Sequence, residues 1–194
     1  MAITNYDLIF GNNAAIVGSE GSGNAIYNVV SGYPNTYFQR SESSRTFTAS
    51  ANLSMNADRS GEVMALAFHV TPGTNLSNSN FYCLTYHITS TNFVTYKLKY
   101  NNTSNLNNTG EIATWTSTQN TVPNNAAVDI SVTDTLFELK VLGNTVISSN
   151  LPNNLTGEGL GFMYAGGWAD RYMNYNNLII TLGRSSGRRR YHIV

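Results

Sequence analysis

The stretch "FYCLTYHITSTNFVTYKLKY", residues 81–100, decides the fold class of this chain. Apolar or aromatic residues occupy every second position on both sides of the short polar segment "TSTN". Because side chains alternate between the two faces of a β-strand, two such runs around a short polar turn predict an antiparallel hairpin. One face carries Tyr82, Leu84, Tyr86, Ile88, Val94, Tyr96, Leu98 and Tyr100, and the other, wetter face carries Thr85, His87, Thr95, Lys97 and Lys99.

The same period of two recurs along the chain. "GEVMALAFHV" (61–70) is apolar on both faces, which is typical of a central strand, and "EIATWTST" (111–118) places Ile112 and Trp115 on opposite faces, so that one of them has to point outward. "VDISV" (128–132), "LFELKVLGNTVISS" (136–149) and "NLIITL" (177–182) add further strands, with Gly143 and Asn144 forming a tight turn. No helical period is present, so the sequence predicts an all-β, antiparallel two-sheet β-sandwich.

Composition bounds the domain organisation. The 194 residues suit one domain, and only 11% of them are charged, against about 25% in an ordinary soluble protein. The lone Cys83 excludes an internal disulfide and is expected to be a small buried side chain. The first ten residues do not form a secretion signal, and no apolar run is long enough for a membrane span, so we expect no membrane insertion.

A basic C-terminal tail is predicted at residues 184–194, after a β-sandwich domain at residues 1–183. Four of the eleven basic residues lie in the tail, which leaves seven basic against eleven acidic residues in the domain, a net charge of −4. The tail is either a solvated chain end or an assembly arm that docks on an acidic surface or a neighbouring subunit. The candidate docking residues are Arg184, Arg188, Arg189, Arg190, Tyr191, Ile193 and Val194.

The order of these strands resembles the concanavalin A-like lectin/glucanase superfamily, and within it the laminin G-like jelly rolls. The likeness rests on "RTFTASANLSMNADRSGEVMALAFHV", the hairpin quoted above, "DTLFELKVLGNTVISS" and "LTGEGLGFMYAGGWADRYMNYNNLIIT", which together span residues 45–182. The resemblance implies a concanavalin A-like jelly roll and a binding site on loops or on one sheet face.

The last of these stretches contains the candidate glycan-binding residues. Gly166 and Gly167 are expected to turn the chain between two core strands, with a loop tip that follows them. Aromatic rings can stack on sugar faces, and Asn, Asp and Arg side chains can bind sugar hydroxyls. The candidates are Trp168, Asp170, Arg171, Tyr172, Asn174 and Asn176, and the alternative is that Trp168 covers the edge of the core in an Asn-rich chain.

No catalytic or metal site is indicated. Glucanases need two carboxylates in one cleft, whereas Glu138 is expected to form a solvated ion pair with Lys140, and Asp129 stands alone on its strand. His69, His87 and His192 are far apart in the sequence, and Asp58 and Glu62 match no calcium loop. We therefore predict that the protein is not an enzyme and uses no cofactor or metal.

Two functions are compatible with these features. Low charge, abundant Asn, Ser and Thr, no signal peptide and a jelly-roll core resemble the head decorations, fibres and tail modules of bacteriophages, which predicts a non-catalytic structural protein on the virion surface. Its partners would be other virion proteins or further copies of itself in a homo-oligomer, with surface glycans as further ligands and without nucleic acid. The first alternative is a stand-alone carbohydrate-binding module. The second alternative is a glycoside hydrolase.

Overall fold

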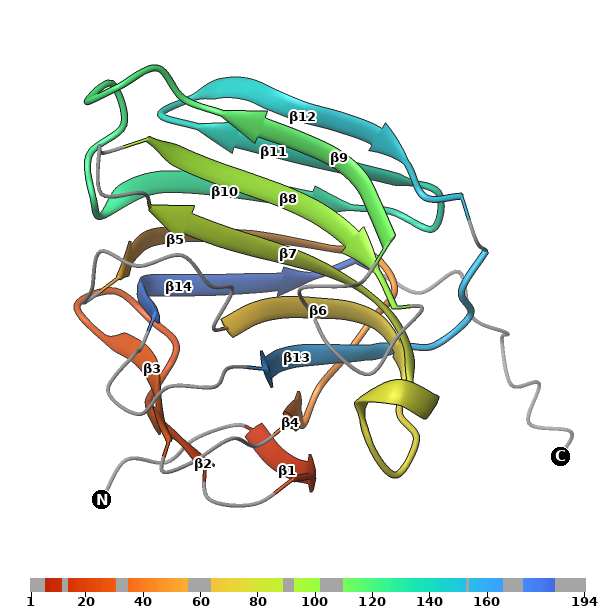
Figure 1. The fold of residues 1–194 in the computed structure, drawn as a ribbon. Helices are drawn as coiled ribbons and strands as arrows, with labels where there is room; N and C mark the ends of the chain where they lie inside the picture. Colours follow the sequence, from red (N-terminus) through yellow and green to blue (C-terminus); the bar gives the residue numbers. More distant parts are fainter. Residues whose placement is uncertain are drawn as a thin grey trace, which may run out of the picture.

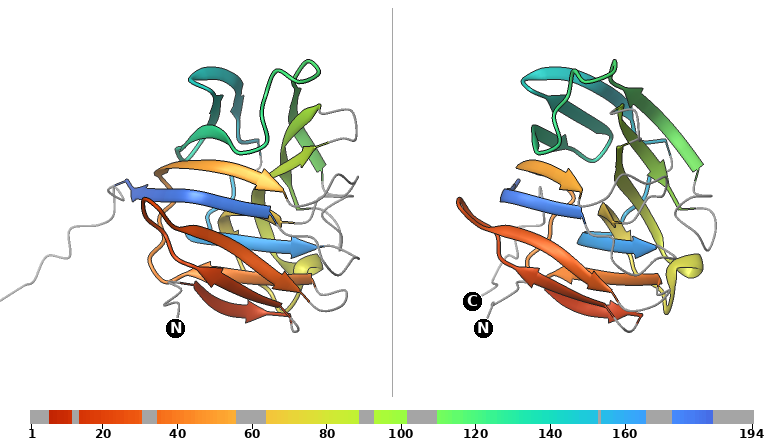
Figure 2. Two further views of the ribbon diagram at one scale, coloured as in Figure 1. Left: turned by 90° about the vertical axis from the view of Figure 1, so that its left-hand side faces the viewer. Right: turned by 60° about the vertical axis from the view of Figure 1, so that its left-hand side comes forward.

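The structure, a computed structural model, describes residues 6–11, 14–30, 35–55, 64–88, 93–101, 110–152, 154–165 and 173–183. Two antiparallel seven-stranded sheets pack face to face (Figures 1 and 2). Sheet A consists, in spatial order, of β1 (Tyr6–Phe10), β4 (Asn35–Arg40), β13 (Gly159–Ala165), β6 (Met64–Thr71), β7 (Asn80–Ile88), β8 (Val94–Tyr100) and β9 (Gly110–Thr116). Sheet B consists of β12 (Asn144–Asn150), β11 (Leu136–Val141), β10 (Ala126–Val132), β5 (Phe47–Met55), β14 (Met173–Leu182), β3 (Ala25–Val30) and β2 (Ala14–Gly18).

The predicted all-β sandwich is confirmed. The strands expected from the alternating runs are all present, and the turn between β11 and β12 has the positive φ of +80° at Gly143. The four strands β1 to β4 precede the residues that carry the resemblance, and each sheet takes two of them. The only helical element of the described residues is the short 3-10 turn η1 (Leu76–Asn78), and none of their helices has the length and apolar character that crossing a membrane requires.

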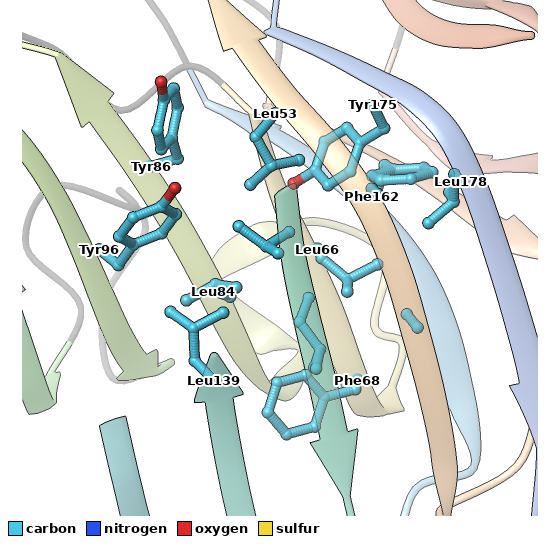
Figure 3. Packing of buried hydrophobic residues seen from close by; sticks show 14 of the residues in the cluster. Leu53, Leu66, Phe68, Leu84, Tyr86, Tyr96, Leu139, Phe162, Tyr175 and Leu178 are labelled. Atoms are coloured by element: carbon cyan, nitrogen blue, oxygen red, sulfur yellow. The ribbon is translucent and has the colours of Figure 1, made fainter. Parts of the chain in front are cut away.

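The core between the sheets is a layer of aromatic and aliphatic side chains (Figure 3). Phe68 of sheet A stacks on Phe137 of sheet B with ring centroids 5.6 Å apart, and Phe162 contacts Tyr175 across the same interface at 4.7 Å. The predicted inward residues Leu84, Tyr96 and Leu98 belong to this layer (Figure 3 labels the first two). Burial of these inner faces provides the main driving force for closing the sandwich.

The outer face of sheet A is not the wet surface that alternation predicted. Thr85 and Lys99, expected in solvent, are only 1% and 2% exposed. A second apolar cluster covers part of this face, and it includes Leu76 of η1 together with buried Cys83. The prediction of a wet face is therefore wrong at these positions, and side chains of β1, β4 and β13, which are distant in the sequence, bury part of this face. The second cluster consists of Phe10, Tyr37, Ala65, Ala67, Val70, Leu76, Phe81, Cys83 and Met163.

A β-bulge decides the orientation of Ile112 and Trp115 in β9. The pairing of β8 with β9 shifts register between Leu98 and Lys99, so that Ala113 is opposite Leu98 and Glu111 is opposite Lys99. The extra residue changes the alternation of faces. Both Ile112 and Trp115 therefore pack against the core, and the expectation that one of them points outward is wrong.

A second bulge places His69 in the core. His69 has a φ of +50°, and the pairing of β6 with β7 shifts register between Phe68 and Thr71. The imidazole is fully buried against the rings of Phe68 and Tyr82, and Nε2 lies 2.8 Å from the carbonyl oxygen of Arg45. Burial lowers the pKa of His69, because a charged imidazolium would lose its hydration there. The ring is thus a structural group and is not available to a ligand.

A buried ion pair joins the two sheets beside strands β1 and β2. Arg40 at the end of β4 forms two hydrogen bonds to Glu20, from Nε to Oε1 at 2.7 Å and from Nη2 to Oε2 at 3.0 Å. Tyr6 of β1 donates a hydrogen bond to the same carboxylate at 2.7 Å. Because Glu20 lies in the turn between β2 and β3, the contact connects sheet A to sheet B. The hydrogen bond to this carboxylate raises the pKa of Arg40, so the guanidinium stays charged.

Loss of the Arg40 guanidinium should destabilise the fold. Arg40→Met leaves the largely buried Glu20 carboxylate without its cation, and we expect the free energy of unfolding to fall by about 3 kcal/mol. The matched control is Arg45→Met, because Arg45 pairs with the half-exposed Asp134 and its loss should cost less than about 1 kcal/mol. Urea unfolding of the three proteins measures both values, and equal losses in the two variants would contradict the assignment.

The buried His69 should make stability depend on pH. As the pH falls through about 6.5, the ordinary histidine pKa, the unfolded chain takes up a proton that the folded chain does not, so stability is lost toward acid. We expect this loss to shrink in His69→Asn, because asparagine tolerates positive φ and cannot titrate. Unfolding free energies between pH 7.5 and 5.5 provide the test, and an unchanged pH slope in the variant would refute the role of His69.

Candidate functional site

A groove of about 460 Å³ lies on the outer face of sheet B, away from the core. It crosses four neighbouring strands, β11, β10, β5 and β14, of which β5 and β14 run side by side in Figure 2. Strands are spaced 4.7–4.9 Å apart, so these four strands span roughly 14 Å. The groove is lined by Thr48, Ala49, Ser50, Asp129, Ile130, Ser131, Glu138, Lys140, Ile179 and Thr181.

The strand register arranges the outward side chains of the groove in two rows. Each row contains one residue from each of the four strands, because residues opposite each other on neighbouring strands share a face. The first row is Lys140, Asp129, Ser50 and Ile179, and the second is Glu138, Ser131, Thr48 and Thr181. The charged residues thus lie on β10 and β11, whereas β5 and β14 contribute hydroxyl groups and one aliphatic side chain.

The alternation of β5 explains why the middle of the groove is polar but uncharged. In "FTASANLSM" every odd-numbered residue is buried in the core, and the outward positions are Thr48, Ser50, Asn52 and Ser54. These small side chains leave room above the sheet. Their hydroxyl and amide groups can each donate and accept a hydrogen bond.

A bulge in β14 directs Ile179 into the groove. The pairing of β14 with β5 shifts register between Asn176 and Ile179, and Asn177 has a φ of +55°. The turn between β2 and β3 holds this bulge, since Gly21 donates to the Leu178 carbonyl at 2.8 Å and Gly23 donates to the Asn177 side chain at 2.7 Å. Leu178 is therefore buried, and Ile179 is 48% exposed.

The charged side chains of the groove correct one prediction from the sequence. Among the described residues, the side chains of Asp129, Glu138 and Lys140 form no hydrogen bond or ion pair, so the predicted Glu138–Lys140 ion pair is absent. Asp129 is the single carboxylate of β10, as predicted, but it lies directly opposite Lys140 and diagonally across from Glu138 of β11. Diagonal neighbours in an antiparallel pair have β-carbons roughly 7 Å apart, so both carboxylates face one groove.

The predicted glycan-binding residues are only partly within the described chain. Trp168, Asp170, Arg171 and Tyr172 lie outside the described residues, as do Gly166 and Gly167. The flanking strands β13 and β14 belong to different sheets. The tail residues Arg184, Arg188, Arg189, Arg190, Tyr191, Ile193 and Val194 also lie outside the described residues.

Asn174 and Asn176 lie on the groove side of sheet B. They are opposite Ser54 and Asn52 in β5, further along the same strands that line the groove. The Asn176 amide donates to Asn125 Oδ1 at 2.7 Å and to Ser54 Oγ at 3.1 Å. Asn176 therefore has a structural role in addition to any contact with a ligand.

The other residues considered for metal binding are not brought together. Within the described ranges, no three His, Cys, Asp or Glu side chains are grouped closely enough to hold a metal ion. Asp58, Glu62 and His192 lie outside those ranges. His87 lies in β7 of sheet A, so it is remote from the groove on sheet B.

Comparison with known proteins shows the fold. No protein-family model matches the sequence, and no curated protein matches it significantly. Among solved structures, the chain is similar to the carbohydrate-binding module CBM66 from Bacillus subtilis, with a TM-score of 0.57 and 14% identity over 93% of this chain and 99% of the other. It is also similar to the mannose-bound exoplasmic/lumenal domain of VIP36, with a TM-score of 0.57 and 10% identity over 94% and 85% of the chains.

An enzyme has the same fold. An alginate lyase from Pseudomonas aeruginosa matches with a TM-score of 0.53 and 14% identity, over 86% of both chains. Together with the module and the lectin-like domain, it confirms the predicted concanavalin A-like jelly roll. At these identities the likeness extends to the fold and not to function.

Proposed function

We propose that this protein is a carbohydrate-binding module and that it binds glycans in the groove on the outer face of sheet B. The observation that carries the proposal is the state of the groove's polar side chains. Of the hydroxyl, carboxylate and ammonium groups that line the groove, none is hydrogen-bonded or ion-paired to a described residue. A sugar presents several hydroxyls, and convergent unused donors and acceptors in an open groove are suited to bind them.

The structural neighbours support this class of ligand. One is a carbohydrate-binding module, and another was determined with mannose bound. These matches favour the alternative function predicted from the sequence over the virion function. The unused polar groups of the groove support the same alternative.

Binding is a better account of the groove than hydrolysis. Two carboxylates on one face are the minimum for a glycosidase, and Asp129 and Glu138 satisfy that minimum. However, a general acid that protonates a leaving group near neutral pH needs an apolar enclosure, whereas Asp129 is exposed and Glu138 is only half-buried.

The particle-surface role stays a prediction from the sequence. It comprises localisation on a bacteriophage virion, other virion proteins or copies of the chain as partners, and docking by the tail at residues 184–194. Glycan binding is compatible with that role, because a surface protein with this groove could attach a particle to a glycan-coated surface.

Filling the groove should abolish glycan binding. Ser50→Trp places a large ring between Asp129 and Ile179, and we expect affinity for any bound polysaccharide to fall at least tenfold. The matched control is Ala15→Trp, which adds the same ring at an exposed position of β2 at the far edge of sheet B. Affinity electrophoresis against a panel of soluble polysaccharides measures binding, and circular dichroism confirms that the variants are folded.

Trp168→Ala distinguishes the groove from the loop predicted by the sequence. We expect this variant to keep its affinity if the groove is the site. Loss of binding in Trp168→Ala together with normal binding in Ser50→Trp would instead assign recognition to the stretch around Trp168. Absence of binding by the intact protein to every polysaccharide would refute the proposed function.

A further inference from the structure

The groove has a charged half and an uncharged half, and this polarity restricts the glycans that it can take. On β10 and β11, Asp129, Lys140, Glu138 and Ser131 form the corners of a square in which hydrogen-bond acceptors and donors alternate. On β5 and β14, Thr48, Ser50 and Thr181 surround the exposed Ile179. We infer that the groove selects neutral oligosaccharides and rejects acidic ones, a specificity that rests on the proposed function.

The charged square is complementary to hydroxyl groups. A hydroxyl can donate to the Asp129 or Glu138 carboxylate and accept from the Lys140 ammonium, so neighbouring hydroxyls of one ring can use all three groups. A carboxylate, sulfate or phosphate group on a glycan can only accept. It would be attracted by Lys140 but would lie beside two carboxylates of its own sign, and the net charge of −1 at this end disfavours it.

The uncharged half of the groove fixes the orientation of the bound oligosaccharide. Ile179 presents an aliphatic surface between Ser50 and Thr181, which suits the C–H face of a sugar ring while the hydroxyls bind the rim. The two halves lie at opposite ends of a groove that crosses four strands, roughly 14 Å. A single sugar ring cannot contact both ends, so an oligosaccharide should bind more tightly than its monosaccharide.

Isothermal titration with two sets of hexasaccharides tests this specificity. The neutral probes are the gluco-, manno- and fructo-oligosaccharides, and the acidic probes are the oligomers of alginate and polygalacturonate. We expect at least one neutral probe to bind at least tenfold more tightly than every acidic one. We also expect its affinity to change less than twofold between 50 and 500 mM NaCl, because no net ion pair forms with a neutral ligand.

Reversing the charge of the square should reverse the selectivity. Glu138→Lys changes the charge of the groove from −1 to +1, and we expect the acidic probes to gain at least tenfold in affinity while the neutral probe loses affinity. Glu158→Lys, at an exposed position outside the groove, makes the same change in total charge and should leave both affinities unchanged. A gain for acidic probes in both variants would indicate long-range attraction and would overturn the inference.

A second pair of variants tests the uncharged half. Ile179→Ser should weaken the neutral probe about tenfold, whereas Leu8→Ser, at a residue of similar exposure on the edge strand β1, should not. Equal effects of the two substitutions would remove Ile179 from the binding site.

The outcomes separate this inference from the proposed function. If the intact protein binds acidic probes as tightly as neutral ones, and Ser50→Trp abolishes that binding, the groove is a glycan site but the specificity inferred here is wrong. If no probe binds the intact protein and no polysaccharide binds it either, the proposed function fails and the specificity fails with it.

Discussion

The pairing of β5 with β14 is the constraint on which both the core and the groove depend. These strands come from distant parts of the chain and lie next to each other in the middle of sheet B. Their inward residues, such as Leu53 and Tyr175, fill the space between the sheets, while their outward residues form one half of the groove floor. A shift of one residue in this pairing would exchange the two sets of side chains, so core burial fixes the register of the binding surface.

β-Bulges then change which side chains face the core and which face solvent. The bulge at Asn177 directs Ile179 outward, the bulge at His69 directs an imidazole into the core, and the bulge in β9 turns both Ile112 and Trp115 toward the core. Each changes the alternation of faces at one point, as an inserted residue must. Hydrogen bonds from the turn between β2 and β3 hold the first of these, and the Glu20–Arg40 ion pair anchors the same turn to sheet A. The groove therefore depends on contacts at the opposite edge of the sheet.

The proposed binding site lies on a sheet face and not on the loop that the sequence predicts. The sequence predicts a glycan site around Trp168, because aromatic and amide groups are concentrated there. Trp168 itself lies outside the described residues. None of the described residues that line the groove is aromatic, so nothing in its composition stands out along the sequence. The feature that suits the groove to binding is its set of polar side chains without partners among the described residues. These side chains come together only when their strands pair.

The sequence by itself determined the class of fold, because the period of two in runs such as residues 81–100 is a local property that survives any pairing of the strands. It also indicates one contact in the groove, since the short turn after β10 makes Asp129 and Lys140 neighbours across a hairpin. The tertiary structure alone decided which faces are wet. A second apolar cluster on the outer face of sheet A brings together side chains of β1, β4, β6, η1, β7 and β13, and the groove arises because β5 joins β10 to β14. Such contacts between distant segments leave no periodic signal in the sequence, and the bulges that correct the faces arise where paired strands differ in length by one residue.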